Sequence, residues 1–109
     1  MINWSRVAEL RDEIGAEDFG DVVDLFLEEV DEEIANLSGP VAAEGLEARL
    51  HFLKGSALNL GFDAFSDLCR DGEQRAAGGE GGAVDLVAIC DTYARSKTRF
   101  LTELEHRFA

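Results

Sequence analysis

The sequence predicts an all-α protein, an antiparallel four-helix bundle with a short accessory helix at its N-terminus. Apolar residues recur at steps of three and four along most of the chain, and no segment alternates with period two, so no sheet is expected. Short connections between long amphipathic segments favour antiparallel neighbours. The chain has 109 residues, 46% of them hydrophobic. This length suits one domain, which we assign to residues 1–109 with the bundle at about 18–107.

The first two helices are expected over about 4–14 and 18–37. Asn3 or Ser5 can cap the first helix. Because this helix is shorter than the others, we expect it to cover one end of the bundle. The second helix has an apolar stripe made of Phe19, Val22, Val23, Phe26, Val30, Ile34 and Leu37. Its other faces are rich in Asp and Glu. We interpret them as solvated, with a docking surface for a basic partner as the alternative.

Two breaks divide the rest of the chain. Pro40 follows a serine and a glycine, and residues 78–82 read Gly-Gly-Glu-Gly-Gly, a short flexible linker. The remaining helices are expected over about 41–60, 63–77 and 83–107. Gly61 is the expected C-terminal stop of the third helix.

The last two helices also carry apolar stripes. The fourth turns Phe65, Leu68 and Cys69 inward. The fifth has a stripe of Val84, Val87, Cys90, Ala94, Lys97, Leu101 and Leu104, with Tyr93 and Phe100 beside it. Lys97 interrupts this stripe, and we expect its stem to lie along the bundle while its amine reaches water.

The charge of the chain excludes some classes of partner. Twenty-three acidic residues against ten basic ones give a net charge of −13. Such a surface repels phosphate backbones and anionic lipids, so we expect no nucleic-acid or membrane partner. The sequence has no apolar run of about 18 residues and no visible signal peptide.

Cys69 and Cys90 are far apart in the sequence and lack CxxC partners. We interpret both as buried small hydrophobes in the reducing cytoplasm. A disulfide between them is the minority alternative. Zinc-site spacing is absent, so no metal or other cofactor is expected.

The segment His51 to Gly61 is the most informative part of the chain. A helix turns about 100° per residue, which puts the segment's apolar stripe roughly opposite His51. That stripe consists of Leu46, Leu50, Leu53, Ala57 and Leu60. Lys54, Gly55 and Leu58 fall within about 60° of the histidine, and Glu47 lies one turn earlier on the same side. We therefore predict an exposed imidazole beside a cation, a gap and an apolar residue.

Imidazole is a nucleophile near neutral pH, and its free nitrogen can accept a phosphoryl group. Lys54 can offset charge on the transferred oxygens, and a side chain at Gly55 would obstruct a partner. No P-loop, GxGxxG or kinase motif set is present, so we expect no ATP binding and no autonomous kinase activity. A partner must bring the phosphoryl group and its metal.

The pattern His51-x-Leu53-Lys54-Gly55-Ser56-Ala57-x-x-Leu60-Gly61 resembles the signature of histidine-containing phosphotransfer (HPt) domains. The spacing to Cys69 and the aromatic Tyr93 in the last helix are also similar to that family. The resemblance covers roughly residues 19–104. It implies a four-helix bundle with an accessory N-terminal helix, and reversible phosphorylation of His51 on Nε2 by aspartates of response-regulator receiver domains.

The resemblance also implies roles for other residues. Lys54 would sit near the phosphoryl group, and Gly55 would let the receiver approach. An acceptor on the fourth helix would bond Nδ1 of His51, and that position falls on Glu73, or on Gln74 if the register slips by one. The chain departs from the family in having Leu50 before the histidine, where a small residue is common, and Gly72 before Glu73, where a larger apolar one is common.

We therefore expect a monomeric phosphorelay protein whose partners are receiver domains, with a hybrid sensor histidine kinase as a further candidate partner. The docking residues would be Gly55, Leu58, Phe52 and Glu47. One alternative is a non-catalytic helical module that binds a regulator through Phe52 and Leu58. Another is the substrate domain of a chemotaxis-type histidine kinase, which has a similar histidine-bearing bundle. A metal site of His51, Glu47 and Glu73 has little support because paired ligand motifs are absent.

Overall fold

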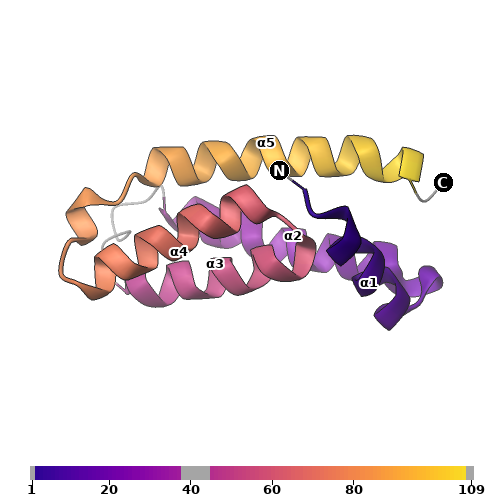
Figure 1. Cartoon of the computed structure of the whole chain (residues 1–109), viewed down its shortest axis with the longest axis horizontal. Helices are drawn as coiled ribbons and strands as arrows, with labels where there is room; N and C mark the ends of the chain where they lie inside the picture. The colour runs from indigo at the N-terminus through magenta and orange to yellow at the C-terminus, as the bar shows by residue number, and fades with distance from the viewer. Residues whose placement is uncertain (1, 38–44, 108–109) are drawn as a thin grey trace.

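The computed structural model describes residues 2–37 and 45–107, which form a helical bundle (Figure 1). The helices are α1 (Trp4–Ile14), α2 (Ala16–Leu37), α3 (Leu46–Leu60), α4 (Asp63–Ala77) and α5 (Leu86–Arg107), with a short 3₁₀ turn η1 (Gly81–Ala83) before α5. The four long helices lie lengthwise beside one another, and α1 lies at one end. Within the described ranges there is no strand, only an isolated bridge between Ile2 and Phe62. The all-α bundle with an accessory N-terminal helix is confirmed.

The helix boundaries follow local signals. α1 and α4 have the predicted bounds, and α2 begins two residues earlier than predicted. α5 begins at Leu86 rather than residue 83, because Asp85 accepts a hydrogen bond from the amide of Ala88 at 2.9 Å and so caps the helix there. α3 begins at Leu46 rather than residue 41, because Gly45 has a left-handed φ of 62°. The predicted helical residues 41–44 and the break at Pro40 lie outside the described residues.

Two predicted capping positions are confirmed, and together they attach α1 to the bundle. Asn3 caps α1, with its side-chain oxygen 3.1 Å from the amide of Arg6. Gly61 ends α3 in the left-handed conformation, at φ 77°. The amide of Asn3 donates to the carbonyl of Gly61 at 2.6 Å. The start of α1 is therefore bonded to the turn between α3 and α4.

The core lies between the four long helices. All five residues of the predicted α3 stripe are buried. On α2 the residues Phe19, Val23, Val30 and Leu37 are buried as predicted, whereas Val22, Phe26 and Ile34 are only half-buried. Leu27, which lies outside the predicted stripe, is buried as well.

The predicted stripe of α5 is wrong by one residue, a rotation of about 100°. The buried positions are Ile89, Tyr93, Ser96 and Phe100. Val87 is instead 80% exposed, and Leu101 is exposed too. Large aromatic rings bury the most area and so set the rotation of the helix. Tyr93 packs on Phe65 with ring centroids 5.1 Å apart, and Phe100 packs edge-on against Phe62 at 5.2 Å.

The true register brings Lys97 to α2 rather than leaving its amine in water. Its ammonium forms an ion pair with Asp31 at 2.7 Å, and the Tyr93 hydroxyl donates to the same carboxylate at 2.6 Å. Burial raises the pKa of Asp31, but Lys97 and Tyr93 outweigh it, so the pKa lies below its usual value. Burial, and then the contact with Asp31, raise the pKa of the Tyr93 phenol. This cluster ties α2 to α5.

Both cysteines are free thiols. Cys69 is fully buried, and burial raises its thiol pKa to about 12, as expected for an inert small hydrophobe. Cys90 is only half-buried, which corrects the prediction for that residue.

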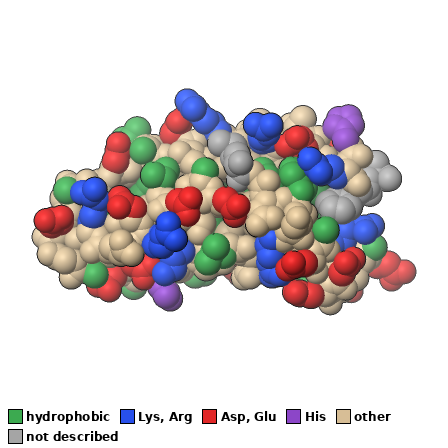
Figure 2. All heavy atoms as spheres, viewed as in Figure 1, with side chains coloured by type: hydrophobic (Ala, Val, Ile, Leu, Met, Phe, Trp, Pro, Cys, Tyr) green, Lys and Arg blue, Asp and Glu red, His purple; other side chains and the backbone are tan. Residues whose placement is uncertain are grey.

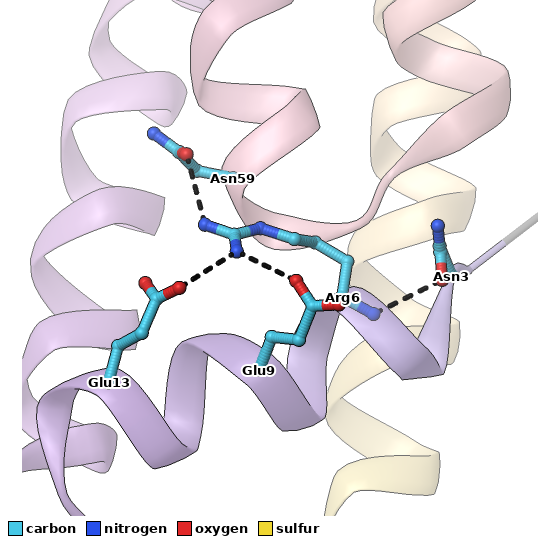
Figure 3. A network of polar contacts seen from close by, with 5 residues as sticks. All are labelled: Asn3, Arg6, Glu9, Glu13 and Asn59. Atoms are coloured by element: carbon cyan, nitrogen blue, oxygen red, sulfur yellow. Dashed lines mark hydrogen bonds and ion pairs between the residues drawn. The ribbon is translucent and has the colours of Figure 1, made fainter.

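Polar and aromatic contacts hold α1 on the end of the bundle. Arg6 bonds Glu9 and Glu13 within α1 and reaches the side-chain oxygen of Asn59 on α3 at 3.4 Å (Figure 3). On α5, Phe100 stacks on Trp4 at 5.7 Å, and the guanidinium of Arg107 lies 4.4 Å from the same indole ring. α1 is therefore fixed to both α3 and α5.

The surface reflects the composition of the chain. On the face shown in Figure 2, acidic side chains are spread along the length of the molecule with basic ones between them. In the described part of the chain, no helix combines the length and the apolar character needed to cross a membrane.

Candidate functional site

The site is built on the outer face of α3. The helix buries its leucine stripe, and this leaves His51 on the opposite side with 69% of its side chain exposed. The exposure predicted from the helical wheel is thus observed. An exposed imidazole keeps its polar ring atoms available to a molecule approaching from solvent.

The neighbouring helix α4 supplies a carboxylate to this imidazole. α3 and α4 are joined by a short turn at Gly61 and Phe62 and run antiparallel (Figure 1), and this brings Glu73 beside His51. Oε1 of Glu73 lies 2.7 Å from Nδ1 of His51, and the Glu73 side chain is only 18% exposed. Gln74, the other candidate from the sequence, is exposed on the next position of α4.

The same carboxylate has a second partner. The ammonium of Lys54, one turn beyond His51 on α3, lies 2.7 Å from Oε2 of Glu73. Lys54 and then His51 lower the pKa of Glu73, and they outweigh the burial that raises it. Glu73 is therefore an ionised carboxylate that bridges two basic groups of α3.

This contact selects one form of the imidazole. A carboxylate oxygen can only accept a hydrogen bond, so the contact is satisfied when Nδ1 carries the proton. Nε2 is then the nitrogen with a free electron pair in the neutral ring. The arrangement offers a nucleophilic nitrogen on an exposed face, with a negative charge behind the ring.

A comparison with protein families decides the assignment. The family model described as Hpt domain matches residues 21–107. This chain belongs to the Hpt domain family. The match covers most of α2, from residue 21, and the whole of α3, α4 and α5, and it omits α1. No curated protein and no solved structure matches the chain. Hpt domains take part in histidine phosphotransfer in phosphorelay signalling, where they interact with receiver domains.

The surface around His51 in this Hpt domain is open. A Cβ added to Gly55 would meet no atom within 4 Å, so no packing inside the domain requires this glycine. Leu58 is 54% exposed and Phe52 is 42% exposed, so both apolar side chains are open to solvent near His51. Glu47 is exposed one turn before the histidine. All four predicted docking residues are therefore accessible.

Sequence reasoning missed one contact of the site in this Hpt domain. The ion pair between Lys54 and Glu73 was not predicted, although their opposite charges on adjacent helices were a signal for it. The two departures from the family pattern, Leu50 and Gly72, pack closely against each other directly behind the site. Among residues 2–37 and 45–107, no group of three His, Cys, Asp or Glu side chains could hold a metal ion.

Proposed function

We propose that this Hpt domain is a phosphorelay protein in which His51 carries the phosphoryl group. The observation that carries the proposal is the exposed imidazole whose Nδ1 lies 2.7 Å from the carboxylate of Glu73. Membership of the Hpt family supports the reaction class, and the geometry supports this particular residue.

The reaction uses Nε2 as nucleophile. Nε2 attacks the phosphorus of an aspartyl phosphate on a receiver domain, the bond from phosphorus to the aspartate oxygen breaks, and the carboxylate leaves. The ring becomes a phospho-imidazolium that keeps its proton on Nδ1, and Glu73 stabilises this positive charge. The reverse attack by an aspartate of another receiver returns the histidine to its neutral form.

Lys54 has two roles in this scheme. Its charge keeps Glu73 ionised, and its position one turn from His51 lets it offset charge on the transferred phosphoryl oxygens. The receiver supplies the phosphoryl group and its metal. It docks over Gly55, with Leu58, Phe52 and Glu47 around it.

We further propose that residues 1–109 form one monomeric domain in the cytoplasm. The contacts of α1 with Asn59 and Phe100 support including α1 in that domain. The partners are receiver domains and a hybrid sensor histidine kinase.

Incubation with a phosphorylated receiver tests the proposal. Wild type becomes labelled, His51→Gln stays unlabelled, and His106→Gln, which changes the second histidine of the chain, is labelled like wild type. The bond is acid-labile and fairly alkali-stable, unlike phosphoserine at Ser56. Label on His51→Gln contradicts the assignment. A receiver that binds without labelling any variant instead supports a non-catalytic interaction module.

A further inference from the structure

A buried glycine of α4 lies directly behind the site. Gly72 directly precedes Glu73 on α4, and Leu50 directly precedes His51 on α3. Gly72 therefore faces Leu50 across the two helices, just as Glu73 faces His51. A Cβ added to Gly72 would lie 2.9 Å from Cδ1 of Leu50 and 3.1 Å from Cγ1 of Val84. Both distances are shorter than ordinary carbon contacts of about 3.5–4.0 Å.

The surroundings leave little room for adjustment. Leu50 is fully buried, and Ile89 of α5 lies 3.5 Å from the same added Cβ. A side chain at position 72 must therefore displace Leu50 or push α4 away from α3, because close-packed interiors absorb extra atoms through such shifts. Gly20 of α2 offers a contrast, since a Cβ there meets nothing within 4 Å.

We propose that Gly72 is a positioning residue for the phosphotransfer reaction. Its missing side chain lets Leu50 seat against α4, and this sets the spacing at which His51 and Glu73, the next residue on each helix, meet. The inference rests on the proposed role of His51. The observed 2.7 Å is near the optimum for a charged hydrogen bond, and a shift of several tenths of an ångström takes it beyond the usual range.

Two measurements test this inference on Gly72→Ala. Nitrogen-15 NMR of the imidazole gives the tautomer, and phosphotransfer from a receiver gives the rate. We expect the proton to move from Nδ1 towards Nε2 and the rate to fall by roughly tenfold, because small misplacements of reacting groups are costly. A merely structural role for Gly72 would leave the tautomer of the folded protein unchanged. His106→Gln serves as the background in which the His51 signals are assigned.

The matched controls are Gly20→Ala and the double variant Gly72→Ala/Leu50→Val. Gly20→Ala makes the same change in open space and should keep the wild-type tautomer and rate. Valine has no Cδ1, so the double variant removes the 2.9 Å contact and should restore proton occupancy on Nδ1, including where Gly72→Ala alone fails to fold. A wild-type tautomer in folded Gly72→Ala overturns the inference. A double variant that unfolds, or that does not regain the proton on Nδ1 of His51, overturns it as well.

The NMR measurement needs no phosphoryl transfer, so the two hypotheses fail in different ways. A wild type that takes no label contradicts the proposed function. A tautomer insensitive to Gly72→Ala, in a wild type that is labelled, contradicts only the positioning role.

Discussion

Lys54 and Glu73 form an ion pair between α3 and α4, with 2.7 Å from the ammonium nitrogen to Oε2. The other oxygen of the carboxylate contacts the imidazole of His51, so the single carboxylate of Glu73 links the side chains of Lys54 and His51. Lys54 can therefore affect phosphotransfer through Glu73 as well as through the phosphoryl oxygens. Glu73 is mostly buried, and a mostly buried carboxylate needs such partners to stay ionised.

Removal of the side chain of either Glu73 or Lys54 should slow phosphotransfer without unfolding the domain. We expect Glu73→Ala to lose the acceptor that holds the Nδ1 proton, and Lys54→Ala to lose a positive charge near the transferred oxygens. Each should lower the rate by roughly ten- to a hundredfold, which is less than the roughly hundred- to thousandfold loss when a donor aimed directly at the reacting oxygen is removed. Single-turnover transfer from a phosphorylated receiver measures this.

Circular dichroism and thermal melting provide the folding control for these variants. Arg75→Ala is a matched comparison, because it removes another cation of the α3–α4 hairpin whose ion pair, with Asp71, lies within α4. It should transfer at the wild-type rate. Unchanged rates in Lys54→Ala and Glu73→Ala would show that their support roles are wrong.

The Glu73 contacts predict a dependence of stability on pH. Lys54, and less strongly His51, hold the pKa of Glu73 below its ordinary value of 4.5. A carboxylate with a lowered folded-state pKa stabilises the fold above its unfolded-state pKa, and this contribution is lost as the pH falls through the folded-state pKa. The free energy of unfolding of wild type should therefore exceed that of Glu73→Gln by most above pH 4.5, and the difference should shrink in more acidic solution.

Denaturant unfolding at a series of pH values measures this difference. Lys54→Met removes the larger cause of the lowered Glu73 pKa. In this background the difference in free energy of unfolding that Glu73→Gln makes should therefore be smaller. A difference that stays constant from neutral pH to well below 4.5 would mean that Glu73 does not titrate with a lowered pKa.

Gly55 should report on docking and on stability in opposite directions. It lies inside α3, where glycine costs about 1 kcal/mol relative to alanine, and an added Cβ would meet no atom within 4 Å. Gly55→Gln should therefore raise the free energy of unfolding by roughly 0.5–1 kcal/mol while weakening receiver binding. Gly20→Gln, the same change in the open part of α2, should stabilise without weakening binding. Calorimetry of the domain with its receiver measures the affinity, and undiminished affinity of Gly55→Gln would argue against an interface over this glycine.

Local signals in the sequence were enough to predict most of the fold. The periodic leucines of α3 identify its buried face, and Asn3 and Gly61 mark helix ends by their own capping chemistry. The register of α5 was missed because its sequence allows two neighbouring stripes. Packing of Tyr93 and Phe100 against aromatic rings of α4 and the α3–α4 turn decides between them, and that information is not local.

In the candidate site, too, local sequence signals predict some features and packing between helices determines the others. His51 and its exposed face follow from α3 alone, whereas the position of Glu73 came only from the family resemblance. The Lys54–Glu73 ion pair and the contact of Gly72 with Leu50 depend on the distance between α3 and α4. No periodicity within one helix specifies that distance.

Gly61 should be the least replaceable glycine of the bundle. Its φ of 77° is unfavourable for a side-chain-bearing residue by about 1–2 kcal/mol, and an added Cβ would lie 2.6 Å from the carbonyl oxygen of Asn3, a backbone atom that cannot rotate away. Gly61→Ala should therefore lower the free energy of unfolding by roughly 2 kcal/mol or more. It should also loosen α1, whose Trp4 stacks on Phe100, so tryptophan fluorescence should report local exposure before global unfolding. Gly20→Ala should instead stabilise by up to about 1 kcal/mol, and equal effects of the two variants in chemical denaturation would contradict the strained contact at Gly61.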